Sequence, residues 1–201
     1  MNGQTNTTTM DFTLSDLQRG AAISPCGRMR WTLTRTWDAR PTLVACMFNP
    51  STADALEDDP TISLLSHIAS HNGYGTLVVV NGVPIRSPDP APAYAMLSDN
   101  AAGEPAAVAA MRENLDHILA KTETAGAFLL AWGALAEKTQ ASKNWFDELV
   151  THVALSLPPG GQVFCLGRTA SGAPLHPLAR GKLKLSKTAL LLPFNMASIR
   201  A

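Results

Sequence analysis

Short apolar runs alternate with amphipathic stretches along most of this 201-residue chain, and this alternation constrains the fold more than any other feature. The apolar runs are rich in branched or aromatic side chains, which is typical of strands buried on both faces. Strands that alternate with helices predict a mainly parallel central sheet between two helical layers, a three-layer αβα sandwich of the α/β class. The expected buried strands are residues 43–48, 77–80, 127–131, 163–166 and 189–192.

Three helices are predicted between these strands. Asp59 followed by Pro60 provides a cap and a proline at the first helical position, and Pro105 opens a second stretch with one apolar face. A third helix is expected to begin near Ser142 and to end before the Pro-Pro-Gly-Gly turn at 158–161. Ahead of the first parallel strand, residues 31–37 alternate as a short strand or hairpin arm does.

Length and composition suit a single domain. With 46% hydrophobic residues the chain has enough apolar matter for one sizeable core. Residues 1–10 are polar and rich in Asn and Thr, which predicts a disordered tail and leaves 11–201 as one domain. No apolar run approaches the roughly 20 residues needed to cross a bilayer, so we expect a cytoplasmic protein that does not bind membranes. The oligomeric state is left open, and a monomer is compatible with the sequence.

Charge and short motifs restrict the kinds of site. Lys plus Arg and Asp plus Glu both number 16, so the net charge does not attract nucleic acid, although residues 165–201 hold six basic residues and no acidic one. The three cysteines form no CxxC pair, and phosphate loops, dinucleotide fingerprints and metal-ligand spacings are missing from the sequence. We therefore expect no cofactor and no metal, and we interpret Asp58 and Asp59 as helix-capping residues rather than cation ligands.

Polar clusters follow the expected strands. Asn49 comes directly after the first strand, Asn81 after the second with Arg86 beyond it, and Trp132 after the third. His176 lies in a further cluster at 172–177. Since ligands of parallel sheets bind beyond the carboxyl ends of the strands, these side chains are expected to meet at one edge of the sheet.

Four segments resemble motifs of the uracil-DNA glycosylase superfamily and occur in that superfamily's order. Asn49-Pro50-Ser51 resembles the loop that holds the hydrolytic water, and 77–83 resembles the strand ending in the asparagine that reads the base. Residues 128–138 are similar to the core strand and its turn, and His176-Pro177 looks like a shortened loop that supplies a histidine to the leaving base. The resemblance implies a glycosylase-like fold with a pocket for an everted pyrimidine.

A second resemblance covers more of the chain. From Arg30 to the last expected strand, the sequence is similar to a bacterial and phage family marked by Asn-Pro-Ser-Thr-Ala-Asp, Asp-Asp-Pro-Thr, Ala-Trp-Gly and Gly-x-Pro-x-His-Pro. This family has a sequence pattern but no activity to transfer.

Excision of a pyrimidine requires an oriented water, a donor for the departing base and a pocket that identifies it. Asn49 is expected to orient the water, Asp54 is the nearest carboxylate if a general base is needed, and His176 is expected to donate to the base oxygen. Asn81 offers the donor and the acceptor that pair with uracil or thymine. The other substrate-binding candidates are Pro50, Ser51, Arg86 and Trp132, and those for DNA phosphates are Arg168, Arg180 and Lys182.

Each candidate also has a structural interpretation. Ser51 or Thr52 suits a helix cap, and Asn81 with the following glycine suits a strand-ending turn. Trp132 and His176 suit core positions, and the alternating Lys and Leu of 182–187 suit a solvated strand.

Three functions are compatible with these residues. The first is a nucleobase-directed enzyme that acts on a modified or non-standard pyrimidine in DNA by glycosidic cleavage. The second is thymine hypermodification by group transfer to a 5-substituent, for example of an amine onto phosphorylated 5-hydroxymethyluracil. Ser51 favours it, because one branch of the superfamily carries a shielding tyrosine there. The third is a module that binds DNA or a nucleotide without turnover.

Overall fold

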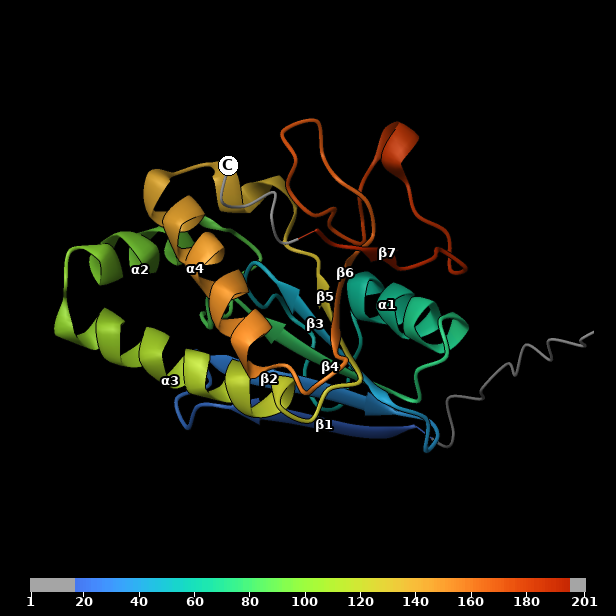
Figure 1. Ribbon diagram of the computed structural model, residues 1–201. Coiled ribbons are helices and arrows are strands. Elements are labelled where there is room, and N and C mark those ends of the chain that lie inside the picture. The colour runs from blue at the N-terminus through green and yellow to red at the C-terminus, as the bar shows by residue number, and fades with distance from the viewer. Residues whose placement is uncertain (1–16, 196–201) are drawn as a thin grey trace, which may run out of the picture.

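The computed structural model describes residues 17–195, which form one seven-stranded sheet with helices on both faces (Figure 1). The order of the strands across the sheet is β1-β2-β4-β3-β5-β6-β7. This arrangement confirms the expected α/β class and is consistent with a three-layer sandwich. The strands are β1 (Gln18–Ile23), β2 (Arg30–Thr36), β3 (Thr42–Met47), β4 (Thr76–Asn81), β5 (Ala127–Leu130), β6 (Gln162–Cys165) and β7 (Leu192–Pro193).

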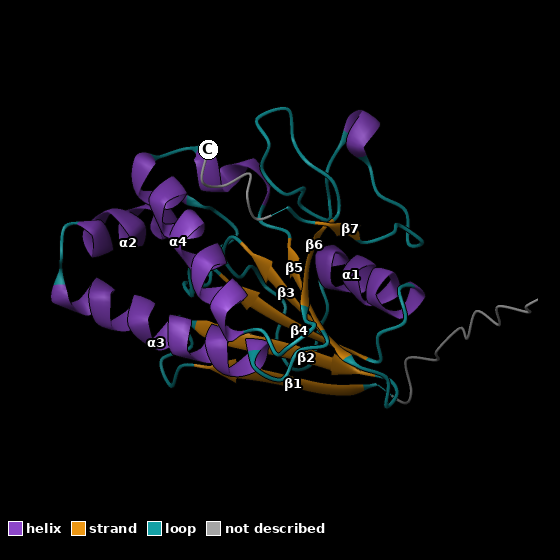
Figure 2. Ribbon diagram, in the orientation of Figure 1, coloured by secondary structure: helices purple, strands orange, loops and turns teal. Residues whose placement is uncertain are grey.

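The sheet separates two core clusters, each covered by helices. One face of the sheet is covered by α1 (Pro60–His71), and the other by α2 (Ala91–Ala101), α3 (Pro105–Thr122) and α4 (Gln140–Ser156) (Figure 2). Alternation along β4 serves both faces: Leu77 and Val79 pack in the cluster on the α1 side, and Val78 and Val80 in the cluster with the other helices. Two short 3₁₀ helices, η2 (Gly133–Glu137) and η3 (Gly181–Leu183), lie in the loops.

The centre of the sheet is parallel and its borders are antiparallel. Strands β4, β3, β5 and β6 pair in parallel, whereas β1, β2 and β7 join antiparallel. Counted along the chain, the parallel strands have the spatial order 2-1-3-4. The connection after β3 leads to α1 and that after β5 leads to α4 on the opposite face. In parallel sheets, ligands generally bind beyond the carboxyl ends of two such neighbouring strands.

The helix starts follow their sequence signals. Asp59 caps α1 by accepting from the N–H of Ile62 at 2.9 Å, as expected from the Asp-Pro pair. Helix α3 begins at Pro105 as predicted. Helix α4 begins at Gln140, slightly before the expected position, because Thr139 is its cap and forms a reciprocal capping box with Ser142.

Three elements differ from the prediction. The prediction of a strand at 189–192 is wrong. Strand β7 comprises only Leu192–Pro193, and Leu191 packs against the core cluster beside α1. Residues 182–187 form the end of η3 and a loop rather than a solvated strand. Helix α2 and strand β1 were not predicted, although the arm at 31–37 is confirmed as the β2 partner of β1.

The tail predicted at residues 1–10 lies outside the described residues. Within 17–195, no helix is both long enough and apolar enough to span a membrane.

Gly82, directly after β4, has no room for a side chain. A Cβ there would lie 2.3 Å from Cζ of Phe146, a ring already stacked on Phe48. We expect Gly82→Ala to lower the free energy of unfolding by about 1–3 kcal/mol, measured by urea denaturation. Gly20→Ala is the control, because its nearest atom is Cβ of Thr34 at 3.9 Å. Equal effects of the two substitutions would contradict this packing argument.

Candidate site at the carboxyl end of the parallel strands

Asn81, the last residue of β4, is a buried amide without hydrogen bonds. Its side chain is 0% exposed, and neither Nδ2 nor Oδ1 has a partner among residues 17–195. By alternation with Leu77 and Val79 it lies on the α1 side of the sheet, next to Met47 in the parallel register. Buried polar atoms in folded proteins are nearly always hydrogen-bonded, so this amide is a candidate for binding a ligand.

Four residues hold all the unpartnered buried side-chain atoms in the described part of the chain, and each lies in, or has a contact with, β4 or the segment after it. They are Nε of Arg30, both amide atoms of Asn81, Nε of Arg86 and Oδ1 of Asn114. Asn114, on α3, donates to the carbonyls of Asn81 and Gly82 at 2.9 and 3.2 Å. The N–H of Arg30 donates to the carbonyl of Pro84, three residues past β4. The unpaired polar atoms thus lie near the end of β4, that of Asn114 on the α3 side of the sheet and those of Asn81 on the α1 side.

Arg30 and Arg86 come from segments that pair directly with each other, because Met29 and Ile85 form an antiparallel bridge. Nη1 of Arg30 donates to the carbonyl of Ala53 at 2.6 Å, and Nη2 of Arg86 donates to that of Thr52 at 3.5 Å. The two guanidinium groups therefore reach consecutive residues of the loop that connects β3 to α1.

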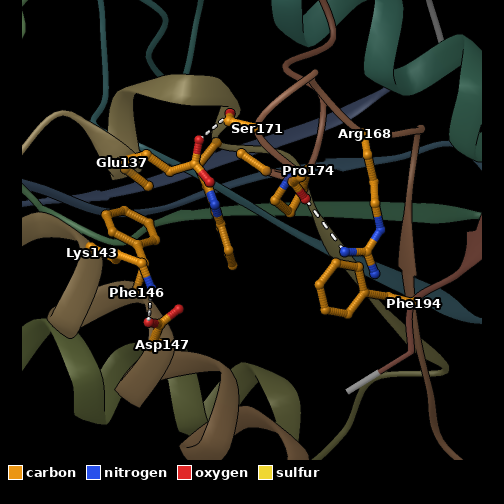
Figure 3. A pocket seen from close by; sticks show the side chains of 12 residues that line it. Glu137, Lys143, Phe146, Asp147, Arg168, Ser171, Pro174 and Phe194 are labelled. Atoms are coloured by element: carbon orange, nitrogen blue, oxygen red, sulfur yellow. Dashed lines mark hydrogen bonds and ion pairs between the residues drawn. The ribbon is translucent and has the colours of Figure 1, made fainter. Parts of the chain in front are cut away.

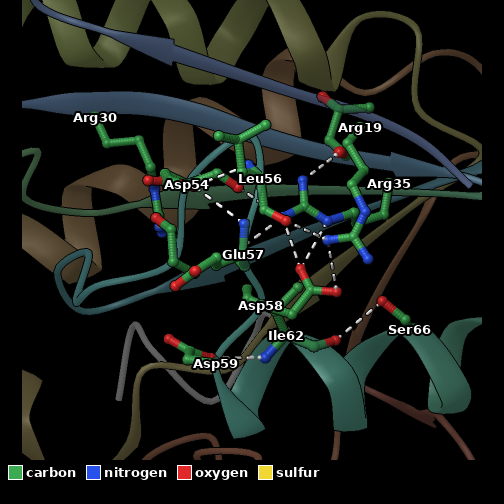
Figure 4. Close-up of polar contacts among 12 residues, drawn as sticks. Arg19, Arg30, Arg35, Asp54, Leu56, Glu57, Asp58, Asp59, Ile62 and Ser66 are labelled. Carbon is green, nitrogen blue, oxygen red and sulfur yellow. Dashed lines mark hydrogen bonds and ion pairs between the residues drawn. The ribbon is translucent and has the colours of Figure 1, made fainter. Parts of the chain in front are cut away.

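Arg30 is an unusual core residue. It is 1% exposed, and within 17–195 neither it nor Arg86 forms an ion pair. Burial lowers the pKa of Arg30 to about 10; Asp59 opposes this shift and Arg86 adds to it. Arg35, also buried, contrasts with it, because Nη2 of Arg35 lies 2.6 Å from the carboxylate of Asp58 (Figure 4).

Asn49 is fixed by its amide nitrogen. Nδ2 donates to the carbonyls of Ser87, Pro50 and Ile85 at 2.8, 3.2 and 3.4 Å. Since all three partners are carbonyls, the nitrogen faces them and Oδ1 is left as an acceptor. Asn49 thus joins the loops after β3 and β4 while it presents one oxygen.

His176 packs against the residue that follows the β5 loop. A Cβ on Gly133 would lie 3.1 Å from Cβ of His176, and the N–H of Gly133 donates to the carbonyl of Pro174. Nδ1 of His176 accepts from the N–H of Leu178 at 3.1 Å, so the neutral ring carries its proton on Nε2. Burial lowers the pKa of His176, and Asp59 acts in the opposite direction. Near neutral pH this side chain is an uncharged donor.

The acidic side chains of the loop before α1 mainly stabilise the local structure. Oδ1 of Asp54 accepts from the N–H groups of Leu56 and Glu57, which keep the pKa of its carboxyl below the ordinary value. Asp58 pairs with Arg35, and Asp59 caps α1 while acting electrostatically on both Arg30 and His176. Asp59 and Asp54 thus both act electrostatically on Arg30, and only Asp59 also acts on His176.

Two of the sequence-predicted residues lie on the opposite side of the sheet, around a cavity of about 230 Å³ (Figure 3). Trp132 lines it with its ring tilted on Phe146 at 4.8 Å, and is 4% exposed. Arg168 stacks over Phe194 at 4.3 Å and donates to the carbonyl of Gly172. Trp132 and Arg168 thus do not join Asn81.

The remaining candidates occupy different surroundings. Pro50 is buried and its carbonyl accepts from Asn49 and from the N–H of Ser87. Ser51 does not cap a helix, because α1 begins only at Pro60. Arg180, the residue before η3, and Lys182, within η3, are both exposed. Among the described residues no three His, Cys, Asp or Glu side chains are grouped as metal ligands, and Cys26, Cys46 and Cys165 are free thiols.

Arg30, Asn114 and Asp59 were not predicted as parts of the site. Asp59 had the only usable signal, since a capping carboxylate at the start of the helix after β3 lies at the edge where ligands bind. Arg30 is in strand β2 and Asn114 is in helix α3, and the sequence does not indicate that either polar side chain is buried.

Fold and site together define an α/β protein with a buried polar site at the carboxyl end of its parallel strands. Comparison of the sequence with known families then identifies the chain as a member of the DUF1643 family, described as proteins of unknown function, whose pattern matches residues 30–178. No curated protein and no solved structure matches the chain. The matched segment contains Arg30, Asn49, Asn81, Arg86 and His176.

If the Asn81 amide serves a ligand rather than the fold, its removal stabilises the protein. We expect Asn81→Leu to raise the free energy of unfolding by about 1–3 kcal/mol, because a buried amide without partners is replaced by an apolar group of similar size. Asn114→Leu is the matched control. It should lower the same quantity by about 1–3 kcal/mol, because two hydrogen bonds to carbonyls are lost. A loss of stability in Asn81→Leu would show that Asn81 is structural.

The pKa of His176 predicts a pH dependence of stability. Because burial lowers its pKa in the folded state, the unfolded chain takes up a proton first as the pH falls below the ordinary value of 6.5. Stability is therefore complete above 6.5 and declines below it, and His176→Gln should flatten this decline. Melting temperatures between pH 5 and 8 test this, with the exposed His71→Gln as control. An unchanged slope in His176→Gln would contradict the assignment.

Proposed function

We propose that this protein is an enzyme that binds a modified or non-standard pyrimidine of DNA and cleaves its glycosidic bond. The observation that carries the proposal is the unpartnered, fully buried amide of Asn81 at the end of β4. Its Nδ2 suits the carbonyl at position 4 of a uracil-type ring, and its Oδ1 suits the N–H at position 3. In a site closed to water, a base that lacks either group leaves a buried polar atom unpaired and is rejected.

In the proposed reaction, His176 acts on the departing base and Asn49 acts on the attacking water. In this proposal, Nε2–H of His176, left available as a donor because Nδ1 accepts from Leu178, donates to an oxygen of the departing base, where negative charge develops as the bond from C1′ to the ring nitrogen breaks. Oδ1 of Asn49 is the acceptor that orients a water toward C1′. The water oxygen bonds to C1′, and its proton ends on the released base. Since an amide is a poor base, the reaction depends on departure of the base.

Access to Asn81 requires movement, because no part of its side chain reaches solvent. In this proposal, the loop between β3 and α1 moves to admit the base, which requires release of the contacts of Arg30 with Ala53 and of Arg35 with Asp54. A base turned out of the DNA duplex enters such a pocket, and closure then excludes water from the reaction.

A second candidate function is favoured by Ser51 and by the two arginines. Ser51 is a small residue beside Asn49, and Arg30 and Arg86 offer positive charge that an uncharged base does not use. In this alternative, an amine attacks the methylene carbon of phosphorylated 5-hydroxymethyluracil. A carbon–nitrogen bond forms, the carbon–oxygen bond breaks, and phosphate leaves with the bonding electrons. The base remains attached to the sugar.

One experiment tests the proposal. The protein is incubated with oligonucleotides that contain uracil, 5-hydroxymethyluracil or its phosphate, with and without a primary amine, and the products are measured by mass spectrometry. We expect a released base, and we expect Asn81→Leu to abolish release and His176→Gln to slow it by about 100- to 1000-fold. His71→Gln should keep full activity.

The products separate the alternatives. An amine-substituted nucleoside with an intact sugar bond would replace excision by group transfer. Unchanged nucleosides with every oligonucleotide, or full activity in Asn81→Leu, would overturn the proposed enzyme.

A further inference from the structure

The two arginines of the site form a cationic pair that the structure leaves without a counter-anion in contact. Both guanidinium groups bind the same loop, through the carbonyls of Thr52 and Ala53, and Nε of each is buried without a partner in residues 17–195. Moving a cation out of water is costly unless it is paired. Arg35 shows how the fold meets this cost elsewhere, since Asp58 neutralises it.

The carboxylates nearby are committed to other donors. Asp54 accepts the N–H groups of Leu56 and Glu57, and Asp59 accepts that of Ile62. Both act on Arg30 over a distance, but neither forms an ion pair with Arg30 or Arg86 among the described residues. The chain therefore supplies a partial counter-charge at this point and leaves N–H donors for an anion.

We propose that Arg30 and Arg86 bind a terminal phosphate monoester of the substrate, beneath the loop that connects β3 to α1. Guanidinium groups are the side chains best suited to phosphate, because their N–H donors match its oxygens in pairs. Arg30 is 1% exposed, and this enclosure favours a terminal phosphate over a backbone phosphodiester, which carries a chain on both sides. Asn81 lies on the same side of the sheet, so in this proposal its amide binds the base of the same ligand.

The attribution of this phosphate to a substrate rests on the proposed function, whereas its binding does not. The phosphate belongs either to a free nucleotide or to a phosphorylated substituent of a base in DNA. Both present the same dianion to the arginines, so the probes have to distinguish them.

The test is isothermal titration of the full chain at constant ionic strength with four probes. They are inorganic phosphate, thymidine 5′-monophosphate, an oligonucleotide with phosphorylated 5-hydroxymethyluracil, and the same oligonucleotide without that phosphate. We expect inorganic phosphate to bind and the phosphorylated probe from the true source to bind tighter. Arg86→Gln, which alters a half-buried side chain, should weaken binding by about 10- to 100-fold.

The controls make each outcome decisive. Arg112→Gln removes the same charge from an exposed position of α3 and should leave phosphate binding unchanged. Arg30→Gln should also lose binding; if it fails to fold, Arg86→Gln alone decides. Equal phosphate affinity in Arg86→Gln and the unaltered protein, or no binding of any phosphate probe, would overturn the proposal. Because the titration needs no turnover, phosphate binding without base release would contradict only the proposed reaction, and base release without phosphate binding only this site.

Discussion

Parallel pairing of β3 with both β4 and β5 is the constraint on which the rest of the structure depends. Four residues of β3 are 0% exposed, so this strand has to be apolar on both faces; they are Leu43, Val44, Ala45 and Cys46. Polar side chains can leave such a strand only at its ends. Because three neighbouring strands point the same way, Asn49, Asn81 and Gly133 lie at one edge of the sheet, and the helices that follow β3 and β5 lie on opposite faces.

This constraint explains which parts of the fold were predictable from sequence. The buried strands and the starts of α1 and α3 depend on local signals, namely apolar runs and an Asp-Pro or Pro at the first turn. The apolar run before β7 was misinterpreted because its burial comes from contacts with the α1-side core and not from strand pairing. Helix α2 was missed because only Ala93 and Leu97 are buried on it, which leaves a weak apolar stripe.

The placement of Asn49 and Asn81 at one edge of the sheet was predictable, because they lie at the carboxyl ends of β3 and β4. The burial of Arg30 on the α1 side was not predictable, because a bulge in β2 determines the direction of its side chain. Ala22 pairs with Thr32 and Ile23 with Arg30, so Trp31 is an extra residue in β2. Its ring stacks on His117 of α3, while Arg30 turns to the α1 side and binds Ala53. Strict alternation would have placed Arg30 with Thr32 on the other face.

The concentration of unpaired polar atoms connects stability with function. A buried donor or acceptor without a partner costs about 1–3 kcal/mol, against a total stability of about 5–15 kcal/mol for a domain. In the described residues these atoms belong to Arg30, Asn81, Arg86 and Asn114, which lie near the end of β4, with Asn114 on the α3 side of the sheet and Asn81 on the α1 side. Under the proposed function, a ligand that pairs the amide of Asn81 would recover the cost that these unpaired atoms impose on the protein alone.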